Sequence, residues 1–211
     1  MSGKLHVLDH PLVATHVTTL RDQSTPPEQF RSEVRRLTTL LAYEASKNLE
    51  TGPRTVQTPL EPFEGSELAQ RIGLVPILRA GLGMVGPILD LIPTAEVWHL
   101  GFYRDEQTKQ PVEYYSKLPE HNNVDTAFVI DPMLATGGSA IAALQALTDW
   151  GVPHLKLLCL LGAPEGVDAV RQAFPDADIY LTALDRELNN NAYILPGLGD
   201  AGDRIFNAAA H

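Results

Sequence analysis

The residues of this chain that could do chemistry gather at positions 129–139, which read Val-Ile-Asp-Pro-Met-Leu-Ala-Thr-Gly-Gly-Ser. An apolar, strand-like segment leads into Asp131, then into a loop of small and hydroxyl-bearing residues, and then into a helix. Gly137 and Gly138 allow several backbone N–H groups to point inward, and the positive end of the helix dipole adds to their attraction. The loop can therefore hold a phosphate ester without a lysine, and Asp131 is placed to bind sugar hydroxyls.

The simpler interpretation of this stretch is an ordinary strand-to-helix turn, in which the glycines supply backbone freedom and Thr136 or Ser139 caps the helix. We favour phosphate binding because an acid, a threonine, two glycines and a serine fall within nine residues, between a strand and an amphipathic helix. No lysine follows Gly138, which excludes the Walker pattern of nucleoside triphosphatases.

Two arginines could bind a more highly charged group. The net charge of −10 gives no long-range attraction for nucleic acid or an anionic membrane, so an anionic ligand must be captured by local positive groups. Arg79 stands before Ala80 and Gly81 on a tight loop that suits a diphosphate, although a surface arginine on a glycine turn would look the same. Arg104 could reach that diphosphate with bidentate geometry, but taken by itself it is typical of a solvated arginine.

Residues 81–86 also match the G-x-G-x-x-G pattern of dinucleotide-binding folds, and we reject that interpretation. The unit is not the first strand-to-helix turn of the chain, no acid clearly ends a following strand about 20 residues on, and Gly86 precedes Pro87.

Residues 131–139 resemble the phosphoribosyl pyrophosphate (PRPP) signature of the phosphoribosyltransferase family, in the form found in its uracil branch. Many relatives carry two adjacent acids where this chain has Asp131 followed by Pro132, which departs from the general pattern and agrees with the uracil branch. The resemblance extends to four further segments, 10–13, 41–45, 76–84 and 193–203, and so spans nearly the whole chain.

This resemblance implies transfer of ribose 5-phosphate from PRPP to N1 of uracil, giving UMP and diphosphate, with Mg²⁺ held mainly by PRPP and few protein ligands. The implied catalytic residues are Asp131, Arg79, Arg104 and Asp200. The implied PRPP-binding residues are Arg79, Arg104, Asp131, Pro132, Met133, Leu134, Ala135, Thr136, Gly137, Gly138, Ser139 and Asp200. The resemblance also makes the Arg79–Ala80 bond a candidate for a non-proline cis peptide.

The segment 193–203 is rich in glycine, which leaves its backbone bare enough to approach a flat ring. Backbone N–H and C=O groups can match the two acceptors and one donor on the edge of uracil. The resemblance implies that the base is bound by Tyr193, Ile194, Gly199, Asp200 and Ala201. Without the resemblance, a glycine-rich terminal loop of no special function would explain the same residues.

Two other functions stay open. The first is a phosphoribosyltransferase for another nucleobase, and the second is a non-catalytic, nucleotide-sensing regulator on the same fold that binds RNA, which the acidic balance disfavours. The resemblance also implies a homo-oligomer, a dimer or larger, for which the long capped helix expected to begin within residues 25–28 is a candidate interface. GTP is a candidate effector, because some relatives respond to it.

The length and composition predict one domain over residues 1–211, with 44% hydrophobic residues to form its core. Strands alternate with helices, which favours a doubly wound α/β fold with a mainly parallel sheet flanked by helices. We expect the lone Cys159 to be buried and inert, and no transition-metal site among the scattered histidines. No signal segment and no apolar stretch of about 18 residues is seen, so a cytoplasmic location and no membrane contact are expected.

The apolar pattern predicts strands at 74–78, 95–103, 124–130, 155–161 and 179–183, and helices at 84–91, 139–150 and 165–174. A further helix should begin at a capping box in 25–28, carry Phe30 and Leu37 on its apolar face and end at Gly52. A polar stretch between aromatics predicts a protruding β-hairpin at about 102–117, either a flap over the active site or a surface turn or dimer contact. The base-binding segment should cover about 184–206.

Overall fold

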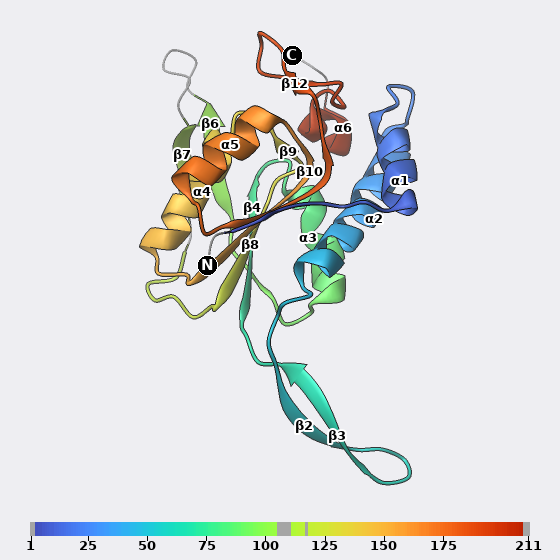
Figure 1. Cartoon of the computed structure of the whole chain (residues 1–211), viewed down its shortest axis with the longest axis vertical. Coiled ribbons are helices and arrows are strands. Elements are labelled where there is room, and N and C mark those ends of the chain that lie inside the picture. The colour runs from blue at the N-terminus through green and yellow to red at the C-terminus, as the bar shows by residue number, and fades with distance from the viewer. Residues whose placement is uncertain (1–2, 105–110, 117, 209–211) are drawn as a thin grey trace.

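A central, mostly parallel sheet organises the chain (Figure 1). The computed structural model describes residues 3–104, 111–116 and 118–208. The order of the strands is β1 (Leu5–Val7), β11 (Asp178–Leu184), β10 (His154–Gly162), β8 (Thr126–Ile130), β4 (Ile72–Leu78), β6 (Leu100–Arg104) and β7 (Pro111–Ser116). Two short strands lie off this path, β5 (Glu96–Val97) beside β4 and β9 (Met133–Leu134) beside β10. Every described pairing in this sheet is parallel except that between β6 and β7.

Helices cover both faces of the sheet, which confirms the doubly wound α/β fold (Figure 1). One face is covered by α1 (Pro11–Arg21), α2 (Pro27–Ala45) and α3 (Leu82–Leu91), and the other by α4 (Gly138–Asp149) and α5 (Pro164–Ala173). The central strand β8 is buried along its whole length because side chains on both of its faces meet a helical layer. The last helix, α6 (Ala201–Phe206), packs against α2.

The strand that we expected at 95–103 is two strands, β5 and β6, with the chain leaving the ladder between them. The expected hairpin is present, since β6 and β7 pair antiparallel with Phe102 opposite Glu113 and Arg104 opposite Pro111. Residues 105–110 and 117, which belong to the expected flap at 102–117, lie outside the described residues.

The expected capping box of α2 is wrong. Pro26 is the N-cap residue and makes no side-chain cap bond, while Thr25 Oγ1 donates to the Thr19 carbonyl oxygen in α1 at 2.6 Å. The prolines of the first turn move the start of the helix past Thr25, so its hydroxyl is free to join the two helices instead. The helix also ends at Ala45 rather than at Gly52, which lies in a strand.

A long hairpin that the sequence analysis did not predict projects away from the sheet (Figure 1). It consists of β2 (Thr51–Gln57) and β3 (Pro62–Leu68), which pair antiparallel over their full length. Both strands are exposed along nearly all of their residues and show no alternation of buried and exposed positions. The pattern that identifies a half-buried strand is therefore absent.

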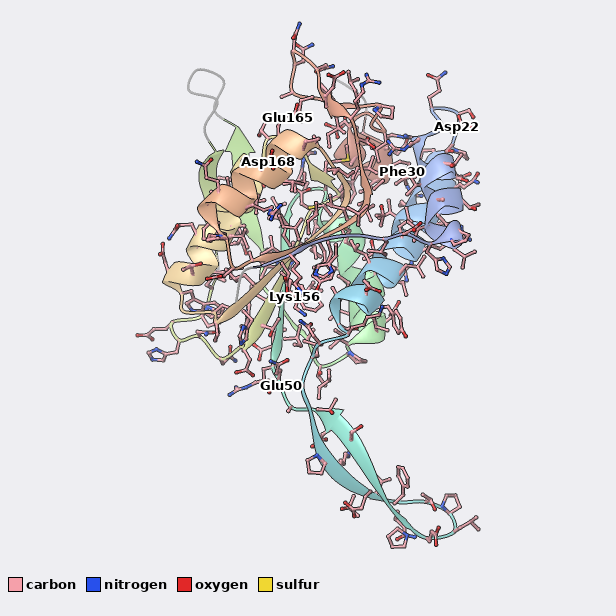
Figure 2. All side chains as sticks on the ribbon, in the orientation of Figure 1. Asp22, Phe30, Glu50, Lys156, Glu165 and Asp168 are labelled. Carbon is pink, nitrogen blue, oxygen red and sulfur yellow. The ribbon has the colours of Figure 1, made fainter. Side chains whose placement is uncertain are left out.

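The buried Lys156 of β10 ties the sheet to the end of α2 (Figure 2). Its Nζ atom donates to the carbonyl oxygen of Ala45 at 2.6 Å and to Oδ1 of Asn48 at 2.5 Å, and burial lowers the pKa of this lysine. Ala45 is the last residue of α2, so the ammonium group satisfies a carbonyl that the helix itself leaves without a partner.

Replacing Lys156 with methionine should lower the free energy of unfolding by about 2 kcal/mol, because the Ala45 carbonyl then stays buried without its charged donor. Urea denaturation followed by circular dichroism measures the change. Lys47→Met is the matched control, since Lys47 pairs with Glu44 at the surface and should change stability by less than about 0.5 kcal/mol. Equal stability of the two variants would contradict this role of Lys156.

None of the helices in the described part of the chain combines the length and the apolar character that a bilayer crossing requires.

Candidate active site

The candidate site lies where the neighbouring strands β4 and β8 end. The loop after β4 carries Arg79 to Gly81, and the loop after β8 carries residues 131–137. Because parallel neighbours end at the same edge of a sheet, the two loops meet there, at the position where open α/β sheets bind ligands. This is the edge that the sequence analysis predicted.

Asp131 is the first residue after β8. Its backbone N–H donates to the Leu158 carbonyl oxygen at 3.2 Å. Burial raises the pKa of the Asp131 carboxyl to about 7, and a hydrogen bond from the Met133 N–H opposes this shift. The carboxyl group can therefore change its charge near neutral pH.

The glycine loop leads into α4 without a side-chain cap. Gly137 is the N-cap residue, with φ of 82°, and no side chain bonds to the first turn. The simpler interpretation, in which Thr136 or Ser139 caps this helix, is therefore not what the structure shows, because a glycine with left-handed backbone occupies the cap position. The N–H groups of the first turn remain directed out of the helix, which is the arrangement that binds phosphate.

The helix α5 packs against this loop through Gly166, a residue that the sequence analysis missed. A methyl group at Gly166 would overlap the carbonyl oxygen of Ala135 and would lie 2.9 Å from that of Leu134. On the loop side, a methyl group at Gly137 would lie 3.0 Å from the Gly166 carbonyl oxygen. The signal in the sequence was a glycine in the first turn of a helix, where nothing in the turn itself requires one.

The loop after β4 closes tightly onto the end of β8. The Gly81 N–H donates to the Ile77 carbonyl oxygen at 3.0 Å, and a methyl group at Gly81 would lie 2.5 Å from the carbonyl oxygen of Ile130. Ile130 precedes Asp131, so the Arg79 loop lies directly beside the Asp131 loop. The non-proline cis bond is Leu78–Arg79, one residue before the expected Arg79–Ala80, at the entry of the turn that Gly81 closes.

Arg79 is exposed on this loop, and the backbone of Arg104 ends β6, the other neighbour of β4. Arg79, which follows β4, and Arg104, the last residue of β6, therefore lie at the ends of adjacent strands at the same edge of the sheet. The side chain of Arg104 lies outside the described part of the structure.

The C-terminal segment reaches the same edge. Gly202 in α6 faces the Arg79 loop, since a methyl group built there would lie 3.8 Å from Cβ of Ala80. A methyl group at Gly83 would lie 3.1 Å from Cδ1 of Ile205. The structure therefore brings together three segments that are far apart in the sequence: the Arg79 loop, the Asp131 loop and the start of α6.

The residues expected to bind the base occupy different parts of this segment. Ile194 is buried in β13 (Ile194–Leu195), which pairs antiparallel with β12 (Glu187–Leu188), and Ala201 is buried at the start of α6. Tyr193 is exposed, and its N–H donates to Oδ1 of Asn189 at 3.0 Å. Gly199 has φ of 83°, with nothing within 4 Å of the position of a methyl group.

Asp200 has a role that the sequence analysis did not include. It is the N-cap residue of α6, where its Oδ1 atom accepts the N–H of Asp203 at 2.9 Å. The carboxylate is exposed and held at the surface of the loop, one residue after Gly199.

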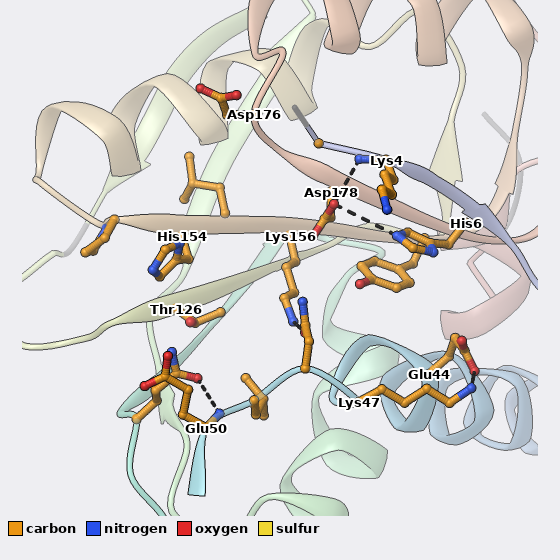
Figure 3. Close-up of a pocket in the computed structure, with 17 residues that line it drawn as sticks. Lys4, His6, Glu44, Lys47, Glu50, Thr126, His154, Lys156, Asp176 and Asp178 are labelled. Atoms are coloured by element: carbon orange, nitrogen blue, oxygen red, sulfur yellow. Dashed lines mark hydrogen bonds and ion pairs between the residues drawn. The ribbon is translucent and has the colours of Figure 1, made fainter. Parts of the chain in front are cut away.

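Two other features of the described residues lie outside this site. Cys159 is fully buried, as expected, and burial together with the charge of Asp131 raises the pKa of its thiol. A cavity of about 630 Å³ lies elsewhere, at the amino ends of the strands, and its lining includes Lys4, His154, Lys156 and Asp178 (Figure 3). Among the described residues, no three His, Cys, Asp or Glu side chains gather closely enough to hold a metal ion.

This architecture is that of the phosphoribosyltransferases. A solved purine phosphoribosyltransferase from Pyrococcus horikoshii is 13% identical and superposes with a TM-score of 0.50, covering 74% of this chain and 90% of that one, a likeness of fold alone. The solved AQ2163 protein from Aquifex aeolicus is much more similar, with 35% identity and a TM-score of 0.92 over 99% of this chain and all of that one.

Sequence comparison narrows the class. The family model described as "Uracil phosphoribosyltransferase" matches residues 7–208. The protein named uracil phosphoribosyltransferase of Roseiflexus sp. (strain RS-1) is 57% identical over 97% of this chain and 98% of its own length. The protein of the same name from Levilactobacillus brevis is 51% identical over 97% of this chain and 98% of its own length. The chain belongs to the uracil phosphoribosyltransferase family.

Proposed function

We propose that this chain transfers ribose 5-phosphate from PRPP to N1 of uracil, releasing UMP and diphosphate. Its family membership supports the reaction. The observation that carries the proposal is the meeting of a glycine loop without a side-chain cap, a loop bearing Arg79 and a glycine-rich C-terminal segment at one edge of the sheet. We assign the whole of residues 1–211 to one catalytic domain, with 102–117 as its flap and 184–206 as its base-binding segment.

PRPP would be bound at its two charged ends. Residues 136–139 hold the 5′-phosphate through backbone N–H groups and the first turn of α4, with the hydroxyls of Thr136 and Ser139 beside them, and residues 132–135 complete the PRPP loop. The carboxylate of Asp131 accepts the ribose hydroxyls. Arg79 and Arg104 bind the diphosphate, which they can engage with bidentate geometry.

Uracil would be bound by the backbone of the C-terminal segment. Main-chain groups near Ile194, Gly199 and Ala201 match the alternating acceptors and donor of the ring edge, Tyr193 borders the ring, and Asp200 lies between the base and PRPP. The positive φ of Gly199 turns its peptide groups in a direction that other residues reach only with strain.

The reaction breaks the bond between the anomeric carbon and the diphosphate oxygen and forms a bond from that carbon to N1 of uracil, and the N1 proton passes to solvent water. Negative charge grows on the diphosphate while positive charge grows on the ribose ring. Arg79 and Arg104 stabilise the negative charge on the diphosphate, and Asp131 orients the ribose ring against the ring nitrogen of uracil. No covalent nucleophile is required, in keeping with the burial of Cys159.

The carboxylates of the proposed site suit a Mg²⁺ ion that is bound mainly by PRPP. Asp131 and Asp200 offer carboxylate oxygens at the edge of the site, hard ligands of the kind that Mg²⁺ prefers, often through its own water molecules. When bound to the diphosphate, the ion supplies further neutralisation of the leaving group.

The experiment that tests the function is incubation with PRPP, Mg²⁺ and each nucleobase in turn, with diphosphate release measured. If uracil is the only base that leads to diphosphate release, the proposal is supported. Diphosphate release with a different base would favour the alternative, a phosphoribosyltransferase for that base. Absence of diphosphate release with every base, together with RNA retention in a filter-binding assay, would favour the non-catalytic regulator.

Two further expectations have their own tests. Adding GTP to the uracil reaction tests whether GTP acts as an effector. Fractionation of the source cells tests the cytoplasmic location that we also propose.

We further propose that the protein is a homo-oligomer held together by the hairpin of β2 and β3. The hairpin exposes the apolar side chains of Val56, Leu60, Phe63 and Leu68, with Leu60 94% exposed. The long helix α2, the interface expected earlier, already buries its apolar face within the chain. A second copy of the chain would remove the exposed side chains of the hairpin from water.

The double variant Leu60→Ser, Phe63→Ser should raise the dissociation constant of the oligomer by at least about tenfold, because two buried apolar side chains are lost from the interface. Sedimentation equilibrium measures the change. Glu64→Gln on the same strand is the control, and an oligomer equally stable in all three proteins would contradict the assignment.

A further inference from the structure

An ion pair between a partly buried arginine and a buried carboxylate joins the end of α1 to the segment that follows β11. Arg21, the last residue of α1, contacts both carboxylate oxygens of Asp185, with Nη1 to Oδ2 at 2.8 Å and Nη2 to Oδ1. The side chain of Asp185 is only 3% exposed. The two residues are 164 positions apart in the sequence.

This pair also binds both polar groups of one backbone unit. Oδ2 of Asp185 accepts the N–H of Gly197 at 2.9 Å, and Nη1 of Arg21 donates to the carbonyl oxygen of Gly197 at 2.9 Å. Gly197 has φ of 62°, and a methyl group there would overlap the Ile194 carbonyl oxygen. The ion pair therefore fixes the orientation of the peptide groups at this bend of the chain.

A second arginine, Arg204 of α6, links the next residue, Leu198, to the same end of α1. Arg204 Nη1 donates to the carbonyl oxygens of Leu198 at 2.8 Å and Leu20 at 2.9 Å, and Nη2 donates to that of Asp22 at 2.6 Å. Its guanidinium carbon lies 4.2 Å from the ring centroid of Phe30. Residues 197 and 198 are thus fixed between Ile194 and Gly199, the two positions proposed to bind the base.

We propose that Arg21 and Asp185 are positioning residues for uracil, which act by fixing the backbone of Gly197 so that the groups on either side meet the ring edge. The inference rests on the base site proposed above. A buried ion pair is in itself weak evidence for a stabilising role, because apolar side chains of similar volume often serve stability equally well. The contacts with both polar groups of Gly197 are what apolar side chains could not make.

The test uses Arg21→Lys and Asp185→Asn. The lysine keeps the charge opposite Asp185, but its single ammonium lacks the planar fork that contacts both carboxylate oxygens and Gly197 together. The asparagine keeps an acceptor for the Gly197 N–H but loses the charge. Arg35→Lys is the matched control, since Arg35 bonds to Asp90 at 3.1 Å in an exposed pair on the same layer of helices.

Both variants should raise KM for uracil about tenfold or more while KM for PRPP changes less than about twofold, because one charge-assisted contact to the base loop is lost and the PRPP loops are untouched. The ratio of kcat/KM for uracil over cytosine should fall in parallel. The control should match the wild type in every constant.

Three outcomes would overturn the inference: an unchanged KM for uracil, an equal rise in KM for both substrates, or failure of both variants to fold, which would make the pair a support of the whole domain. A wild type that forms no UMP would instead remove the proposed function, whatever the variants do.

Discussion

Asp131→Asn is expected to lower kcat/KM for PRPP by about a hundredfold, because the charged acceptor of the ribose hydroxyls becomes a neutral amide. Steady-state kinetics with both substrates measure the effect, and KM for uracil should change little. Asp149→Asn is the control, since Asp149 is an exposed residue at the end of α4 that accepts a bond from Gln145 at 2.7 Å. Unchanged kinetics in Asp131→Asn would remove the carboxylate from the mechanism.

The raised pKa of Asp131 adds a pH dependence to this prediction. With the pKa at about 7, the carboxyl is neutral below that pH and ionised above it. The kcat/KM of the wild type for PRPP should therefore rise with pH through about 7, relative to that of Asp131→Asn. PRPP itself titrates equally in both assays, so the ratio of the two proteins isolates the carboxyl. A ratio independent of pH would contradict the assignment.

Stability should show the opposite trend. The folded state raises the pKa of Asp131 above its ordinary value of 3.8, so the folded protein binds the proton more tightly than the unfolded chain. That contribution to stability is complete below pH 3.8 and is lost as the pH rises through about 7. Thermal unfolding should thus find Asp131→Asn gaining stability relative to the wild type between acidic and mildly alkaline pH.

Gly166→Ala is expected to lower kcat/KM for PRPP by about a hundredfold, through a higher KM or a lower kcat, although Gly166 is not one of the residues proposed to bind substrate. The added methyl group overlaps the Ala135 carbonyl oxygen, so the glycine loop must move, and a displacement of about 1 Å is enough for such a loss. Overpacking should also lower the free energy of unfolding by about 1–3 kcal/mol.

Gly151→Ala is the control for this prediction. Gly151 has φ of 90° with nothing within 4 Å of a methyl group, so alanine there should cost about 1 kcal/mol of stability and leave the kinetics unchanged. Wild-type kinetics in Gly166→Ala would show that the glycine loop tolerates displacement by α5, and would weaken its role as a rigid phosphate site.

Much of the fold follows from local patterns. The apolar run of β10 and the helical spacing of Phe30 and Leu37 in α2 predicted a buried strand and a helix, and both are present. Each pattern shows whether a segment buries one face or both, and residues close together in the sequence are enough to show this. The hairpin of β2 and β3 has no covered face, so it left no such pattern and was missed.

The sequence by itself determined the glycine loop after Asp131, the acidic balance of the chain and the alternation of strands and helices, because each depends on neighbouring residues or on composition. Only the tertiary structure decided that Gly166 supports this loop, that the Arg79 loop lies against the end of β8, and that Arg21 and Asp185 hold Gly197. These contacts join residues that are distant in the chain, and the order of strands in the sheet, rather than any local preference, makes them neighbours.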